Sequence, residues 1–327
     1  MPTTMLGAIR KRLLTPPMAA TSFAARGFPV DTPGRAVLEE TARHVTMGFE
    51  IAIEQKSVEA VGERLELLEN QFRGLGYEGA GMALALRDAM SPRPGTRMLD
   101  DFYGVGGPGA HQIFMGYIGI GFALSYLPRP LWRRAMPDQS RLPESPAVNW
   151  MILDGYGFHE AFFKTEKWVH QQYLSPPLPW RGPHDYVLRV IDQGVGRAMW
   201  FVNGGDVGRL TAMIRDFAPG RASDLWCGAA LAATYAGGVG EEELVKFAKN
   251  SWEFRAEVAQ GAVFAIKQRV LSGLVTAHTE LASQLFCDRS TDAAADLSDP
   301  ARADLPEGSS IPAYEIFRQR IQSHFSA

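Results

Sequence analysis

Seven stretches of the chain begin with a glycine that is followed by small and large apolar residues. These glycines are Gly48, Gly81, Gly121, Gly157, Gly196, Gly228 and Gly261. Neighbouring glycines are 32 to 40 residues apart, within the repeat lengths of about 20 to 50 residues that are typical of solenoids and related arrays. A chain with such a period folds as a row of similar units, because each unit buries its apolar face only against its neighbours.

The segments between these glycines have the apolar periodicity of amphipathic helices. The clearest example runs through Val58, Val61, Leu65, Leu68 and Phe72, at the spacing of one helix face. A glycine inside a helix costs about 1 kcal/mol relative to alanine, so its recurrence indicates that another helix approaches closely there. We therefore predict an all-α fold of helical-hairpin repeats, α-solenoid-like, with about seven helix pairs. An irregular helical bundle is the alternative.

The composition suggests four parts along the chain. Residues 1–30 form an N-terminal extension and residues 31–287 the helical-repeat domain. Residues 288–311 are rich in Asp, Ala, Ser and Pro, which predicts a flexible linker. Residues 312–327 form a C-terminal amphipathic helix with Tyr314, Phe317, Ile321 and Phe325 on one face. This apolar face must dock, either on the repeats of the same chain or on a partner.

Charge and composition exclude several classes of protein. The 327 residues are 46 % hydrophobic and 21 % charged, so the chain has enough apolar material for a core and is not a disordered protein. Its 33 basic and 36 acidic residues give a net charge of -3. No general excess of positive charge is available for a nucleic-acid backbone, and we expect no nucleic-acid partner.

Cysteine content and hydropathy point to a cytoplasmic protein. The two cysteines, Cys227 and Cys287, cannot make a disulfide framework, and a small buried thiol in a helix fits a reducing compartment. The basic cluster at residues 10–12 lacks the apolar section of a secretory signal. The longest apolar run, residues 113–127, is shorter than the roughly 20 residues of a membrane-spanning helix and predicts a buried core helix.

Three residues interrupt the repeat pattern. Glu50 lies two residues after its glycine, and His159 and Glu160 lie two and three residues after theirs, where the other repeats have apolar residues or alanine. A buried charge needs a partner or a task. Asp154 lies close by in the fourth repeat. We take Glu50, Asp154, His159 and Glu160 as candidate catalytic residues for acid-base chemistry. Alternatively, the fourth repeat is out of register and exposes these side chains, or they form a structural polar cluster.

Aromatic residues accompany this polar group and suggest where an apolar ligand would bind. Side chains of this kind more often form a core than a ligand cage, but they would also suit a long apolar substrate. The candidate substrate-binding residues are Tyr117, Tyr156, Phe158, Arg197 and Trp200.

Known catalytic and cofactor motifs are weak in this sequence. Position 163, four residues after His159, is Phe, so the two-histidine zinc helix is missing. The glycine-rich run at residues 104–109 contains Pro108 and follows no strand, which makes it a turn rather than a dinucleotide loop. The nucleophile elbow and the phosphate-binding loop are also missing. We expect no metal and no cofactor.

Several strings in the sequence are distinctive: Thr46-Met-Gly-Phe-Glu50, Leu153-Asp-Gly-Tyr-Gly-Phe158, Asp192-Gln-Gly-Val-Gly-Arg197 and Asp224-Leu-Trp-Cys-Gly228. With them the chain resembles a bacterial family of unknown function that is encoded in enediyne antibiotic gene clusters (UnbL-like). The resemblance runs from about residue 6 to residue 282. It implies a role after an iterative polyketide synthase has released a linear polyene, beside other pathway proteins and a membrane protein that resembles a redox-complex subunit. It implies no agreed chemistry and no catalytic residue.

Two functions follow as hypotheses. In the first, the chain binds the hydrophobic polyene and processes it into the enediyne core, with the polar group of the fourth repeat acting on it while the groove excludes water. In the second, the chain is a non-catalytic helical-repeat scaffold that recruits redox or membrane partners of the pathway. Peripheral membrane attachment through the C-terminal helix is weaker, because its polar face carries only Arg318 and Arg320 against Glu315.

Overall fold

The structure is a computed structural model, and it describes residues 7, 11–12, 15, 18–92, 95, 97–142, 147–306 and 310–326. Every regular element in these residues is a helix, which confirms the predicted all-α class. The chain divides into two units, and the division falls inside the predicted helical-repeat domain. Unit 1 contains residues 1–25 and 39–156, and unit 2 contains residues 26–38 and 157–327. Helices α3 (Arg35–Glu54) and α9 (Met151–Phe163) each contain a boundary.

Unit 1 is built on long helices that carry the repeat glycines. After η1 (Met18–Thr21) and α2 (Phe23–Arg26), these are α3, α5 (Asn70–Met90), α7 (Ile113–Tyr126) and the start of α9. Shorter helices connect them: α4 (Val58–Leu65), α6 (Met98–Tyr103), η2 (Ala110–Gln112), η3 (Arg129–Leu131), α8 (Trp132–Ala135) and η4 (Ala147–Trp150). In α7 the first twelve residues are all buried, so the apolar run is a core helix, as predicted.

The glycines of unit 1 lie where neighbouring helices touch backbone to backbone. A methyl group built on Gly48 of α3 would lie 1.8 Å from the carbonyl oxygen of Gly76 in α5. One built on Gly121 of α7 would lie 2.1 Å from the carbonyl oxygen of Ile152 in α9. The prediction that these glycines mark close helix contacts is therefore confirmed, and α3, α5, α7 and α9 stack in chain order.

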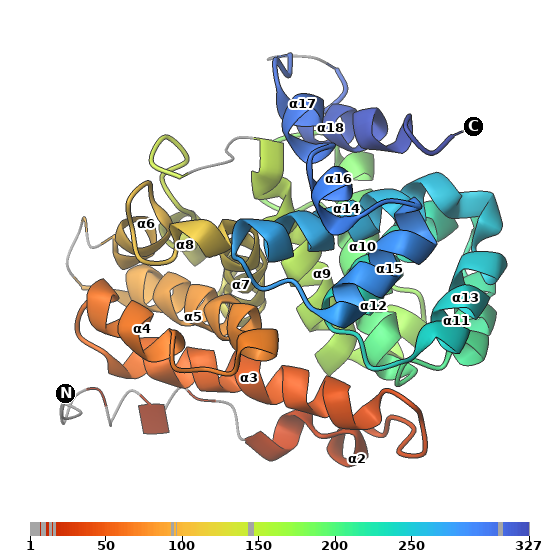
Figure 1. Ribbon diagram of the computed structural model, residues 1–327. Coiled ribbons are helices and arrows are strands. Elements are labelled where there is room, and N and C mark those ends of the chain that lie inside the picture. Colours follow the sequence, from red (N-terminus) through yellow and green to blue (C-terminus); the bar gives the residue numbers. More distant parts are fainter. Residues whose placement is uncertain are drawn as a thin grey trace. The chain divides into compact units, whose positions relative to one another are not determined.

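Unit 2 repeats the arrangement with α10 (His184–Val202), α12 (Ala222–Tyr235) and α14 (Arg255–Leu271) as its glycine helices (Figure 1). Methyl groups built on Gly157, Gly196 and Gly261 would each fall within 2.3 Å of a carbonyl oxygen of the adjacent glycine helix. The shorter helices are α11 (Val207–Arg215), η6 (Pro219–Arg221), α13 (Glu241–Asn250), η7 (Trp252–Phe254) and α15 (Ala277–Cys287). Of these, α11 and α13 pack on each other, and α11 also packs on α12.

The fourth repeat departs from the predicted helix pair. After α9 the chain makes a π-helix, η5 (Glu166–His170), and then runs without regular structure from residue 171 to residue 183 before α10. Two further helices, α16 (Thr291–Ala295) and α17 (Ser298–Arg302), lie in the segment for which we expected a flexible linker. Both pack against α14, and Ala294, Ala295 and Ala301 are buried. Their alanines, which we interpreted as a mark of a linker, are the small residues that allow this packing.

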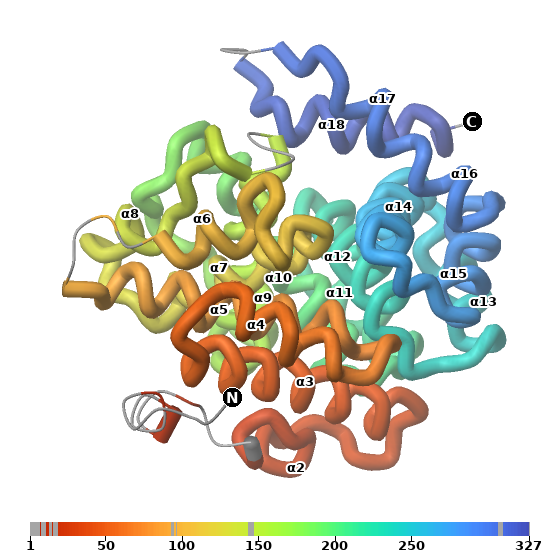
Figure 2. Tube along the Cα trace, turned by 60° about the vertical axis from the view of Figure 1, so that its left-hand side comes forward, coloured from red at the N-terminus to blue at the C-terminus, as the bar shows by residue number. Residues whose placement is uncertain are grey.

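The C-terminal helix α18 (Ala313–Gln322) docks on its own chain. It packs against α14 and α17 (Figure 2). Tyr314, Phe317 and Ile321 are fully buried, and the ring of Phe317 stacks on that of Phe264 with centroids 5.1 Å apart. Unit 2 therefore covers three of the four residues of the predicted apolar face, and this face is not free to enter a membrane. The fourth, Phe325, lies beyond the end of α18 and is half-buried.

Candidate functional site

The candidate catalytic residues of unit 1 occupy different environments. Glu50 is not buried: its side chain is 26 % exposed and its carboxylate lies 2.7 Å from Nζ of Lys11. The expectation of a buried charge at this position is wrong, because the N-terminal segment supplies a cation at the surface of α3. Asp154 is fully buried in α9.

The aromatic candidates of unit 1 are part of its core. Tyr117 has no exposed surface, and Tyr156 is buried with its ring 5.4 Å from that of Trp132. Trp132 itself donates from Nε1 to the carbonyl oxygens of Leu124 and Leu127. A ligand would reach the ring of Tyr117 only after helices of unit 1 had separated.

His159 is a buried imidazole in unit 2. Its ring lies 4.5 Å from that of Phe163, centroid to centroid. Burial, with a smaller contribution from the positive charges of Lys164 and Arg26, lowers the pKa of His159 to about 3. The imidazole is therefore neutral across the physiological range and is a weak base. Arg26 lies near this ring because its guanidinium donates to the carbonyl oxygens of Phe162 and Phe163.

Glu160 is buried and its carboxylate is held by two side chains of the same chain. Lys164, one helical turn later, places Nζ 2.6 Å from Oε1 and 2.9 Å from Oε2. Trp168 donates from Nε1 to Oε2 at 3.0 Å. Because Trp168 lies in the π-helix that follows α9, the irregular end of the fourth repeat is what brings the indole to the carboxylate.

The remaining candidates of unit 2 pack on each other or on backbone. The guanidinium of Arg197 lies 4.9 Å from the ring centroid of Phe158, a cation-π arrangement. Trp200 has no exposed surface and donates from Nε1 to the carbonyl oxygen of Gly237 at 3.0 Å. The nine candidate residues are thus divided between the two units. Within unit 2, the side chains of Phe158 and Arg197 meet, whereas Glu160 is engaged with Lys164 and Trp168.

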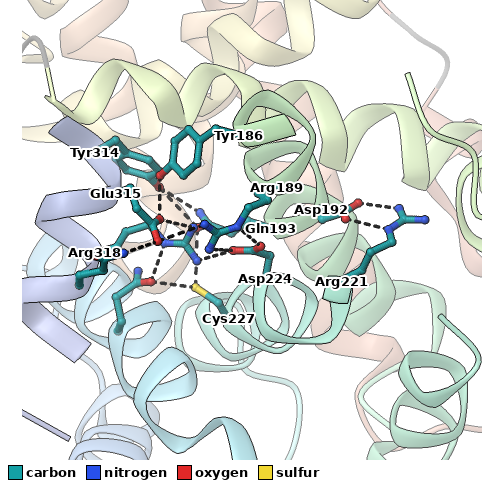
Figure 3. Close-up of polar contacts among 12 residues, drawn as sticks. Tyr186, Arg189, Asp192, Gln193, Arg221, Asp224, Cys227, Tyr314, Glu315 and Arg318 are labelled. Carbon is teal, nitrogen blue, oxygen red and sulfur yellow. Dashed lines mark hydrogen bonds and ion pairs between the residues drawn. The ribbon is translucent and has the colours of Figure 1, made fainter. Parts of the chain in front are cut away.

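The sequence analysis missed a larger buried polar cluster in unit 2, which we call the α18 clasp (Figure 3). Its centre is Arg318 of α18, which has no exposed surface. Arg318 donates from Nη2 to Asp224 of α12 at 2.6 Å and from Nε to Gln260 of α14 at 2.9 Å. The clasp consists of Tyr186, Arg189, Gln193, Asp224, Cys227, Gln260, Tyr314, Glu315 and Arg318.

Four charges alternate within the α18 clasp. Arg189 of α10 lies between the two carboxylates, donating to Asp224 at 2.9 Å and to Glu315 at 3.1 Å. Tyr186 adds a hydrogen bond to Glu315 at 3.0 Å. Burial acts to lower the pKa of Arg318, but the opposing effect of Asp224 and smaller contributions from its other neighbours raise the pKa well above its ordinary value. Arg318 is therefore permanently charged, and the cluster is a set of paired charges without an available acid or base.

A second ion pair joins α10, a helix of the clasp, to η6. Asp192 of α10 accepts two hydrogen bonds from Arg221, at 2.6 and 2.8 Å. Burial raises the pKa of Asp192 even though Arg221 acts in the opposite direction. Asp192 and Asp224 each stand four residues before a repeat glycine, Gly196 and Gly228. That shared position is the signal from which both acidic residues could have been predicted.

No group of three or more His, Cys, Asp or Glu side chains that could hold a metal ion occurs in the part of the chain that the structure describes. The same part contains no helix that is both long enough and apolar enough to cross a membrane. Both cysteines are buried and neither forms a disulfide. Burial raises the pKa of Cys287 to about 12, so this thiol is not a nucleophile.

The fold and this polar cluster define a class: an all-helical repeat protein whose glycine helices stack in chain order within each unit and whose last helix is clasped onto those of unit 2. The chain belongs to a family described as "Protein of unknown function (DUF1702)", whose model matches residues 5–325. No curated protein and no solved structure matches the chain.

Proposed function

We propose that the chain serves enediyne biosynthesis in the cytoplasm as a non-catalytic helical-repeat scaffold that recruits other proteins of the pathway. The observation that carries this proposal is the state of Glu160, the one candidate carboxylate of unit 2. Lys164 and Trp168 of the same chain occupy both of its oxygens. A carboxylate held in this way supports packing of the fourth repeat rather than proton transfer to a substrate.

The pathway itself is proposed from the sequence strings that resemble the enediyne family, and nothing in the fold selects a pathway. The alternative, in which the chain binds and processes the polyene, has less support. Two of its candidate ligand contacts, Tyr117 and Trp200, have no exposed surface. The low pKa of His159 also makes it a poor general base at neutral pH.

A producing strain tests the proposal directly. We expect Glu160→Gln to leave the product titre at the wild-type level, because the amide can still accept from Trp168 and the exposed Lys164 can turn to solvent. The stability cost should stay below about 2 kcal/mol. The measurement is product titre, with the amount of the variant determined by immunoblot. Deletion of the gene is the control that shows the titre depends on the chain.

A scaffold should also be found in a complex. We expect the purified wild-type chain to co-elute in size-exclusion chromatography with at least one purified protein from the same gene cluster and to leave the linear polyene unconsumed. Consumption of the polyene by the purified chain alone would show that it is an enzyme. Loss of product from a producing strain that carries Glu160→Gln at a normal protein level would also show that the chain is an enzyme.

A further inference from the structure

A basic surface of unit 1 contains none of the candidate site residues. Between Phe102 and Pro137 the sequence contains three arginines, Arg129, Arg133 and Arg134, and no Asp or Glu. The chain as a whole has a net charge of -3, so this stretch departs from the general balance. All three arginines are exposed.

The arginines share one face of a short helical segment. Helices η3 and α8 follow each other without a break from residue 129 to residue 135. Arg129 and Arg133 are four residues apart and so lie on the same side of the segment, and Arg134 follows Arg133 around the helix. Trp132 and Ala135 are buried on the opposite side. This amphipathic segment is pinned to the end of α7 by the hydrogen bonds of Trp132 to Leu124 and Leu127.

Exposed apolar side chains border the arginines. Tyr126, the last residue of α7, is 49 % exposed, and Met90, the last residue of α5, is 46 % exposed. Arg134 donates to the carbonyl oxygen of Ser91, next to Met90, which brings the ends of α5 and α8 together. We call Met90, Tyr126, Arg129, Arg133 and Arg134 the arginine surface.

Capping of helix ends explains only part of this surface. Arg134 is accounted for, because a cation at a helix C-terminus is favourable and Arg134 donates to Ser91, the residue that follows α5. Arg133 makes no ion pair among the described residues, and the next carboxylate in the sequence, Asp138, accepts hydrogen bonds from Ser140 instead. Its charge at the surface therefore needs another reason.

We propose that the arginine surface docks on an anionic lipid membrane. Arginine forks bind lipid phosphates, and exposed tyrosine is favoured at the boundary between headgroups and acyl chains. A basic face bordered by Tyr126 and Met90 offers both kinds of contact at once. An acidic protein surface would match the charges alone and would leave the two apolar side chains without a role. This attachment does not depend on the proposed scaffold function.

Vesicle sedimentation of the full-length protein tests the docking. At low salt we expect the chain to sediment with vesicles of phosphatidylcholine and phosphatidylglycerol and to stay in solution with phosphatidylcholine alone. Each arginine contributes roughly five-fold to partitioning, so the double variant Arg129→Gln/Arg133→Gln should bind on the order of 25-fold more weakly. High salt should weaken wild-type binding, because it screens the charges.

A matched control is available in unit 2. Arg209→Gln/Arg215→Gln removes the same charge from α11, where both arginines are exposed, and should bind vesicles like the wild type. Circular dichroism confirms that each variant is folded. The proposal is wrong if the wild type does not sediment with anionic vesicles or if Arg129→Gln/Arg133→Gln binds them as well as the wild type does. It is also wrong if Arg209→Gln/Arg215→Gln loses as much binding as Arg129→Gln/Arg133→Gln. Arginine-dependent retention on poly-glutamate without vesicle binding would identify an acidic polypeptide instead and also overturn it.

Discussion

The side chains of the fourth repeat have stabilising rather than reactive surroundings. His159 packs on Phe163, and burial lowers its pKa to about 3. In the unfolded chain the same imidazole has a pKa near 6.5. Between these two values the unfolded chain binds a proton that the folded chain does not, so protonation favours unfolding as the pH falls.

We predict that the contribution of His159 to the free energy of unfolding falls as the pH is lowered from 6.5 towards 3, by up to ~1.4 kcal/mol per pH unit. His159→Leu keeps an apolar contact with Phe163 and should lose this contribution. The measurement is urea unfolding of both proteins at several pH values. The difference between them isolates His159, because all other titrating groups are present in both. If the free energies of unfolding of the wild type and His159→Leu changed with pH in the same way, His159 would not be a buried imidazole that stays neutral in the folded chain.

The identities of unusual residues could be predicted, but their partners could not. The repeat pattern singled out Glu50, His159 and Glu160, and two of these are buried as expected. The partner of Glu50 is Lys11, on a segment that no periodicity connects to α3. The partner of Glu160 within one helical turn, Lys164, was readable from the sequence, whereas Trp168 reaches it through a π-helix that the sequence did not indicate.

At the level of helices, most of what could be predicted about the fold came from the regular spacing of the glycines. It gave the all-α class, the order of the long helices and the places where they touch, because a missing side chain is the direct cause of close approach. It did not predict the second half of the fourth repeat or helices α16 and α17. Those segments are short or rich in Asp and Ser, so they have no apolar period of their own, and tertiary packing determines their helical structure.

Close helix approach predicts a large difference between two glycine substitutions in unit 2. A methyl group at Gly228 would lie 1.8 Å from the carbonyl oxygen of Gln193, and neither backbone can give way without moving a helix. Gly220 has open space around its Cβ position. We expect Gly228→Ala to lower the free energy of unfolding by about 3 kcal/mol or more. Gly220→Ala should be neutral or stabilising by about 0.5 kcal/mol.

Urea unfolding monitored by circular dichroism measures both glycine variants. Gly228→Ala could prevent folding altogether. In that case it would be missing from the soluble fraction while Gly220→Ala is recovered normally, and this result would again rank Gly228→Ala as the less stable variant. Equal stability of the two variants would mean that α10 and α12 do not touch at Gly228.

At the scale of the whole molecule, the α18 clasp returns the last helix of the chain to the repeats of unit 2. Arg318 and Asp224 are separated by 94 residues, yet their side chains are 2.6 Å apart. The apolar face of α18 could be predicted, but its charged contacts required knowing which acidic residues the helix would meet. Buried ion pairs are weak evidence for stability, because desolvation offsets their attraction, and their better-supported role is to select one arrangement. The clasp therefore fixes where α18 docks.

Removing one charge of the clasp should release α18 before the rest of unit 2 unfolds. In Arg318→Met, Asp224 keeps Arg189 as a partner, but it loses its shortest ion pair, and Gln260 loses a donor. We expect a loss of about 3 kcal/mol in the free energy of unfolding and faster amide hydrogen exchange throughout α18.

Arg320→Ala is the matched control, because this residue of α18 bonds only to the backbone of Ala301 and Ala303 among the described residues. Its stability should change by less than about 1 kcal/mol. A double variant with Asp224→Asn separates pairing from packing: if the clasp couples these side chains, the combined loss is smaller than the sum of the two single losses. Additive losses, or unchanged exchange of the α18 amides in Arg318→Met, would show that the apolar face alone holds the helix.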